Sequence, residues 1–263
     1  MNVALYIAKR YLFTKNKNNA INIISSIAAF GVIVCSASLF VVLCVFAGLR
    51  DFSLQFSTMV DPDLKIIASK GKTLELNNDL ESKLKNIEGI ASYSKIIEER
   101  VVLNYETKNE IVTLKGVDKN YPKSTIDSII SYGSWMSPDT DQIVSGWGVS
   151  NSLSYGVFDF GKTLKLYVPK PGKGYATNPK DAFNQIETQP IGVFSLTEEV
   201  DKKYTFISIE LAQVLLNYKP EQVSAIELKV ENLKNRDETI AVLKNNLGSE
   251  YTIETREQLN AVF

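Results

Sequence analysis

Carboxylate pairs are the side chains in this sequence that could most simply do chemistry. Glutamate pairs occupy positions 98–99 and 198–199, and Asp139 lies two residues before Asp141. Two carboxylates can act as general acid and general base in hydrolysis. The chain has no histidine, which removes the commonest general base and most catalytic zinc sites. Charged pairs on strand edges and loops are usually solvated surface, so we predict no catalytic residue, no metal site and no cofactor.

A second chemical motif lies at Gly156–Thr163, where GVFDFGKT matches the phosphate-loop pattern G-x-x-x-x-G-K-[ST]. A phosphate loop follows a strand and opens a helix, whose terminal N–H groups meet the phosphates. Here the order is reversed, because we predict a helical segment at Ile143–Ser154 and a strand at Thr163–Val168. We interpret the match as a chance turn.

A basic and aromatic stretch follows at Pro169–Pro190, between the strand Thr163–Val168 and a strand predicted at Ile191–Leu196. A loop this long in a compact domain is usually functional or disordered. Its candidate contact residues are Lys170, Lys173, Tyr175, Lys180 and Phe183. The sequence leaves two readings open, a protein-docking loop and a mobile surface loop.

A long uncharged segment near the N-terminus precedes all of these residues and predicts a membrane anchor. Residues Asn18–Leu49 carry no charge, and the apolar core Ile21–Gly48 reaches about 42 Å as a helix, enough to cross a bilayer of about 30 Å. The excess length predicts tilt or a helix that continues past the membrane. A signal peptide would have a shorter core ending in a small-residue cleavage site. We therefore predict a transmembrane helix over residues 18–56.

The flanks of this helix predict its orientation. Residues 1–20 hold four basic side chains and no acidic one, whereas Arg50 is followed at once by Asp51. The positive-inside rule places the N-terminus in the cytoplasm and the main domain in the periplasm. Residues 1–17 are predicted to be a cytoplasmic interfacial helix, with a disordered basic start as the alternative. Nucleic acid is excluded as a partner by compartment.

The remaining pattern predicts an α+β domain. Strands are expected at Asp63–Ser69, Ser92–Asn104, Glu110–Val117, Val223–Val230 and Tyr251–Glu254, and helices at Leu74–Ile87 and Lys234–Leu247, the latter closed by Gly248. Residues 57–118 and 221–255 then form a split β-α-β porter-like subdomain. Residues 119–220 form an inserted, mostly β subdomain with the long loop 169–190, and residues 256–263 begin a further helix.

Particular residues carry a family resemblance: Tyr6–Leu12 (YIAKRYL), Ile23–Ile27 (IISSI), Phe30–Val32 (FGV) and Asp61–Ile66 (DPDLKI). This succession resembles the permease subunits of lipoprotein-releasing (Lol-type, LolC/LolE-like) ABC transporters, which belong with the MacB-type and FtsX-type permeases. The resemblance implies a periplasmic MacB-like domain with a hook-like hairpin near Pro169–Pro190. Family members have four membrane helices, so residues 256–263 would lead to a missing second one, and the chain is expected to be a truncated product or a fragment.

The resemblance also implies a function in the inner membrane. A permease of this kind, not itself an enzyme, would extract lipoproteins and pass them to a periplasmic lipoprotein carrier. Its partners would be an ABC ATPase subunit, a second permease subunit or copy, the lipoprotein substrates and membrane lipid. The residues expected to line the lipid cavity are Val41, Val42, Val45, Phe46 and Leu49. The alternatives are MacB-type efflux, FtsX-type mechanotransmission, and a single-span anchored domain with no ATPase.

Overall fold

The computed structural model describes residues 19–60, 62–122, 127–157, 161–170 and 182–260, together with residues 3, 4, 6, 7 and 10. The chain divides into two compact units, residues 1–55 and residues 56–263. The predicted interfacial helix at 1–17 lies largely outside the described residues, although the five described there are helical.

The first unit is dominated by helix α2, Asn19–Val60, which is 42 residues long. Its segment Ile23–Leu49 has a mean hydropathy of 2.7 and is long and apolar enough to cross a membrane. At about 1.5 Å per residue, the whole helix is roughly 63 Å long, which exceeds a hydrocarbon core of about 30 Å. The helix therefore continues past the apolar run as far as Val60, and the choice between tilt and extension past the membrane stays a prediction.

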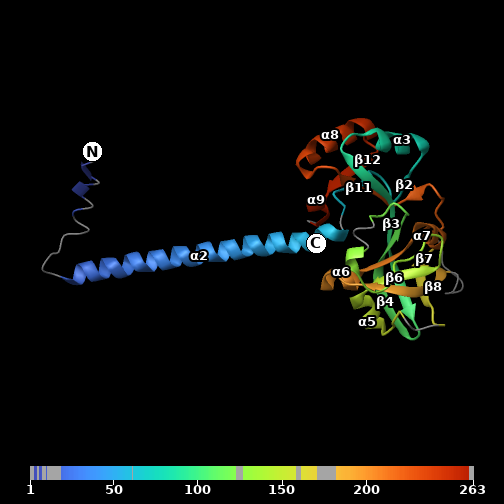
Figure 1. Ribbon diagram of the computed structural model, residues 1–263, viewed down its shortest axis with the longest axis horizontal. Coiled ribbons are helices and arrows are strands. Elements are labelled where there is room, and N and C mark those ends of the chain that lie inside the picture. The colour runs from blue at the N-terminus through green and yellow to red at the C-terminus, as the bar shows by residue number, and fades with distance from the viewer. Residues whose placement is uncertain are drawn as a thin grey trace. The chain divides into compact units, whose positions relative to one another are not determined.

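The second unit (Figure 1) is built on one ten-stranded sheet, in which nine strands follow the order β12-β1-β11-β3-β4-β9-β6-β8-β5. Strand β7 pairs with both β3 and β8, so the six strands β3, β4, β9, β6, β8 and β7 form a closed ring. The strands are β1 Leu64–Ala68, β3 Ile90–Tyr105, β4 Lys108–Val117, β5 Ile130–Gly133, β6 Gln142–Gly146, β7 Leu164–Pro169, β8 Phe183–Phe194, β9 Tyr204–Ser208, β11 Ala225–Val230 and β12 Tyr251–Thr255. A separate pair joins β2, Leu74–Glu75, to β10, Gln222–Val223.

The two predicted β-α-β units are present. In the first, helix α3 (Asn78–Asn86) connects β1 to β3, and in the second, helix α8 (Arg236–Leu247) connects β11 to β12. Each unit encloses a strand of the other, because β1 lies between β12 and β11, and β11 lies between β1 and β3. Helices α3 and α8 lie side by side (Figure 1) and bury Leu80, Leu84 and Leu243 in the main core.

Local signals explain where these two helices begin and end. The Asn77 side chain accepts a hydrogen bond of 2.8 Å from the Leu80 backbone N–H and so caps the start of α3. Gly248 ends α8 at a φ of +78°, a backbone conformation that favours glycine. The shorter helices are α5 Trp147–Leu153, α6 Glu198–Lys203, α7 Ile209–Leu216 and α9 Arg256–Asn260, with a 3-10 turn at Leu233–Asn235.

A second, aromatic core is built from Phe194, Phe206 and Tyr121, with Trp135 packed against it. The ring centroids of Trp135 and Phe206 are 5.2 Å apart. Tyr121 and Trp135 come from the segments that follow β4 and β5, so these connections cover part of the sheet.

Three predicted elements need correction. Leu74–Glu75 is a strand, and α3 starts only at Asn78. The first part of the predicted helix Ile143–Ser154 is strand β6, followed by α5 from Trp147. The predicted loop Pro169–Pro190 is shorter, because β8 already begins at Phe183. Proline usually marks a loop, which is why the predicted loop extended to Pro190. In the structure Pro190 lies within β8, next to a register shift between β6 and β8, where a residue without an N–H is tolerated.

The boundaries between the porter-like and inserted subdomains stay a prediction. Strand β4 pairs along its whole length with the second part of β3, from Ile96↔Val117 to Tyr105↔Lys108, and the first part of β3 pairs with β11, so strand pairing is continuous through this region.

Candidate functional site

The exposed apolar face of α2 is the first candidate site. Every described side chain from Ile23 to Leu49 is exposed within the structure. At 100° per residue, the five predicted cavity residues fall within an arc of about 140° on one side of the helix, and Phe40 lies opposite the centre of that arc. Among them, Phe46 is 67% exposed and Val42 49%. The structure thus places these residues on one apolar face and leaves their predicted role open.

The second candidate is the hairpin of β7 and β8. The last pair of the hairpin is Pro169↔Phe183, and the Lys170 N–H donates a 2.9 Å hydrogen bond to the Ala182 carbonyl. Lys170 and Phe183 are both exposed at this end of the hairpin. The other predicted contact residues, Lys173, Tyr175 and Lys180, lie outside the described residues. The structure therefore places Lys170 and Phe183, two of the five predicted contact residues, at the same end of the hairpin.

The phosphate-loop match has the wrong surroundings for a nucleotide. Helix α5 precedes it and strand β7 begins directly after it at Leu164, as predicted. The Lys162 ammonium forms a 2.8 Å ion pair with Glu106 and lies 5.7 Å from the ring centroid of Tyr105. Residues 158–160 of the match are outside the described part of the chain. In the described part, no helix N-terminus follows the lysine.

Three of the glutamates in the carboxylate pairs form ion pairs with three different lysines. Glu98 and Glu99 alternate along β3, and their partners are Lys65 and Lys72. Glu198 lies in the first turn of α6, 2.6 Å from Lys202. Within the described residues, no group of three His, Cys, Asp or Glu side chains could hold a metal ion.

The domain contains a buried network of charged side chains that the sequence analysis did not predict. Lys115 of β4 and Glu227 of β11 form a 2.8 Å ion pair, with side chains only 3% and 7% exposed. Lys65 and Glu98 form a second pair beside it. Burial disfavours the charged lysine, yet the Glu227 carboxylate keeps the pKa of Lys115 well above its usual value. The network depends on the pairing register of the strands, which no local sequence pattern gives: Lys65 is paired with Glu227, and Glu98 with Lys115.

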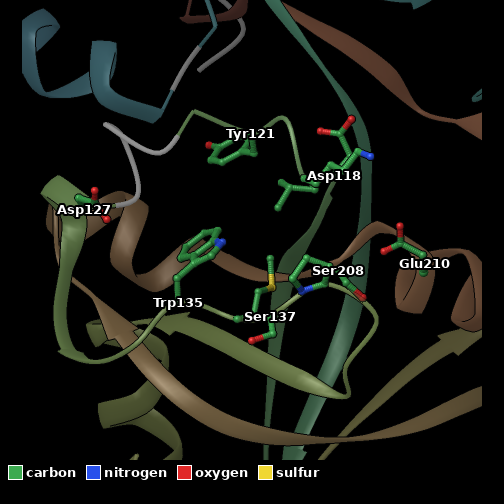
Figure 2. Close-up of a pocket in the computed structure, with 11 residues that line it drawn as sticks. Asp118, Tyr121, Asp127, Trp135, Ser137, Ser208 and Glu210 are labelled. Carbon is green, nitrogen blue, oxygen red and sulfur yellow. The ribbon is translucent and has the colours of Figure 1, made fainter.

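A cavity of about 420 Å³ lies where the parallel strands β4 and β9 end (Figure 2). Its lining residues are Val117, Asp118, Lys119, Tyr121, Asp127, Trp135, Met136, Ser137, Pro138, Ser208 and Glu210. Tyr121 and Trp135 are nearly parallel, with an interplanar angle of 6° and centroids 6.2 Å apart. Burial, with a contribution from Glu210, raises the pKa of Asp118 against the effect of its hydrogen bonds. The cavity combines aromatic walls with carboxylates.

Comparison with known proteins places the chain in a family. The model of the MacB-like periplasmic core domain matches residues 25–245. The lipoprotein-releasing system transmembrane protein LolE of Haemophilus influenzae is 24% identical over 241 residues, which cover 88% of this chain and 56% of LolE. LolC of Buchnera aphidicola subsp. Acyrthosiphon pisum is 25% identical over 232 residues, with the same two shares. The chain thus spans about half the length of the curated relatives it matches.

Among solved structures, the periplasmic region of MacB from Actinobacillus actinomycetemcomitans aligns with a TM-score of 0.48 at 14% identity. That alignment covers 76% of this chain and 91% of the MacB region. The family match itself extends over residues 25–245 of the 263. The chain therefore belongs to the family of the MacB-like periplasmic core domain, which confirms the resemblance to LolC/LolE-like and MacB-type permeases that its sequence carries.

Proposed function

We propose that this chain is part of the permease subunit of an inner-membrane ABC transporter that extracts lipoproteins and passes them to a periplasmic carrier. One observation carries the proposal: a 27-residue apolar helical segment with no described side chain buried precedes a MacB-like domain in a chain similar to LolE and LolC. ATP hydrolysis resides in a separate ATPase subunit, and a second permease subunit or copy completes the membrane part.

Moving the acyl chains of a lipoprotein out of the bilayer favours a helix with an exposed apolar face. Burying an acyl chain contributes about 0.8 kcal/mol per methylene, so the lipid anchor of a lipoprotein does not cross water freely. The anchor must pass from the bilayer into an apolar cavity and from there to an apolar carrier. The face formed by Val41, Val42, Val45, Phe46 and Leu49 supplies one wall of that cavity, near the outer leaflet.

The β7–β8 hairpin supplies the contact with the carrier. Its strands are fixed by continuous pairing from Leu164↔Thr188 to Pro169↔Phe183, so residues at its end are presented by a rigid base. The aromatic Phe183 is 41% exposed and Lys170 is exposed beside it. An aromatic side chain can anchor a contact, and lysines can steer an acidic partner. The residues Lys173, Tyr175 and Lys180 complete this proposed surface.

The test replaces residues 171–181 with a short glycine-serine turn in the full chain and measures capture of the periplasmic carrier. The Lys170–Ala182 hydrogen bond and the whole of β8 stay in place, so the melting temperature is expected to stay unchanged while carrier capture is lost. A matched control replaces the exposed Lys165 and Glu187 side chains, which pair across the same hairpin, with glutamine. Unchanged carrier capture after the loop replacement contradicts the docking role.

The main alternative keeps the fold and changes the cargo. The matching family model is that of the MacB-like periplasmic core domain. MacB-type efflux of a cargo without acyl chains would not need an acyl-binding face on α2. Copurification of the gene product with its partners distinguishes the two, because lipoprotein extraction requires acylated proteins among the cargo.

A further inference from the structure

The cavity at the ends of β4 and β9 has a charge pattern that the proposed transport activity does not use. Three of its lining residues, Asp118, Asp127 and Glu210, are acidic, and Lys119 is the one basic residue among the eleven. Elsewhere in the domain, carboxylates such as Asp63 and Glu227 have cationic partners within 4.0 Å. Within the described residues, none of the three cavity carboxylates forms such an ion pair, although the charge of Lys95, which is not a lining residue, also acts on Asp118.

The walls of the cavity suit an organic cation. Trp135 and Tyr121 present aromatic rings at the cavity (Figure 2). Val117 and Met136 add apolar side chains to its lining. A cation over an aromatic face is attracted by the ring electrons. The structure already contains one such contact, because the Lys115 ammonium lies 5.5 Å from the centroid of the Tyr121 ring. Guanidinium groups stack on aromatic rings and also pair with carboxylates, so arginine matches both parts of the lining.

The acidic side chains lie in the wall and at the exposed rim of the cavity, which indicates the kind of ligand that can enter it. The Asp118 carboxylate is held by the backbone N–H of Asn120 at 3.1 Å and by its amide at 3.3 Å, which fixes it in the cavity wall. Glu210 follows Ser208 at the start of α7, and Figure 2 shows both beside the cavity. Five lining residues are exposed, namely Lys119, Asp127, Ser137, Pro138 and Glu210. A site with so open a rim fits a side chain projecting from a larger surface better than an enclosed metabolite.

We propose that this cavity binds an arginine side chain presented by a protein partner of the domain, with Trp135 as the stacking surface and Asp118 and Glu210 as the counter-charges. The proposal rests on the geometry of the cavity and is independent of the proposed transport activity. A single arginine in such a cavity is an anchor residue of the kind that dominates protein interfaces.

The experiment uses tryptophan fluorescence of the full chain in detergent micelles. The chain has two tryptophans, so Trp147→Phe leaves Trp135 as the only reporter. A capped Gly-Arg-Gly peptide is titrated, with Gly-Gln-Gly as the uncharged control. We expect a saturable change in Trp135 emission with the arginine peptide and none with the glutamine peptide. Equal changes with both peptides, or no saturable change with the arginine peptide, would overturn the proposal.

Substitutions that change the charge of the cavity distinguish a loss of arginine binding from a loss of folding. Asp118→Asn keeps an acceptor for Asn120, and Glu210→Gln changes an exposed side chain; each is expected to weaken binding about fivefold. Lys119→Gln removes the competing cation and is expected to tighten binding at least twofold, a gain that misfolding does not produce. Glu238→Gln on α8, an exposed residue outside the cavity lining, is the neutral control. Unchanged affinity in the Asp118 and Glu210 variants would refute the assignment.

Discussion

The carboxylate of Asp63 accepts a hydrogen bond from the guanidinium of Arg256, which is 193 residues away in the sequence. Asp63 is the residue before β1, and Arg256 begins α9 directly after β12. Their chain neighbours Leu64 and Thr255 are paired across these two strands. The ion pair therefore joins the strand that follows α2 to the last described strand of the domain.

Loss of this ion pair should destabilise the domain. Asp63 also accepts a 3.0 Å hydrogen bond from the Val230 N–H, and its side chain is only 9% exposed. We expect Asp63→Ala to reduce the free energy of unfolding by about 3 kcal/mol, because the buried Arg256 charge and the Val230 donor lose their acceptor. Urea denaturation measures the change. The control Asp79→Ala breaks the exposed pair with Lys83 and should cost less than about 1 kcal/mol. Equal losses in the two variants would argue against the role of Asp63.

The buried pair Lys115–Glu227 should show strong coupling. Lys115→Met alone leaves the Glu227 carboxylate buried without its nearest cation, and we expect a loss of about 3–5 kcal/mol in unfolding free energy. Lys115→Met combined with Glu227→Leu removes both charges and should recover most of that loss. A double-mutant cycle by chemical denaturation gives the coupling energy. Additive losses would show that the two side chains act independently.

Glu257 should contribute to stability at neutral pH and not in acid. Its hydrogen bond of 2.7 Å with the Arg236 guanidinium lowers the pKa of the carboxyl from 4.5 to about 2. Because the folded pKa is depressed, the contribution is present above the unfolded value and is lost as the pH falls through about 2. The side chain is 61% exposed, so solvent screening keeps the effect small. Glu257→Gln should flatten the acid limb of a plot of unfolding free energy against pH; an unaltered limb would contradict the assignment.

The orientation of α2 predicts the compartment of the domain. A reporter that is active only outside the cytoplasm, fused after Phe263, should be active, because the basic residues precede the apolar run. Val34→Arg, in the middle of the span, should weaken membrane integration at a cost of about 2.5–3.5 kcal/mol. Activity solely from a cytoplasm-dependent reporter would reverse the proposed topology.

Hydrophobic periodicity was sufficient to predict the two β-α-β units, because α3 and α8 each bury residues spaced four apart and β1 alternates in burial over its first residues. Strand β11 alternates apolar and charged residue types, although all of its residues except Lys229 are buried. Strand β8 was harder to recognise, since its first half is mostly polar and mostly exposed or half-buried, and Pro190 lies in its second half. The closed ring of strands depends on the long-range pairing of β7 with β3, which no local pattern encodes. The same holds for the Lys115–Glu227 pair and for the cavity, whose lining comes from four separate segments.

One face of α2 is proposed to contact the acyl chains of lipoproteins. A photo-reactive amino acid placed at Phe46, on the proposed face, is compared with the same group at Phe40, on the opposite side; the two side chains are 67% and 68% exposed. After irradiation of cells that produce the chain with its partner subunits, crosslinked proteins are examined for acylated lipoproteins. We expect lipoprotein crosslinks from position 46 and few from position 40. Equal labelling from both positions, or no acylated protein from position 46, would contradict it.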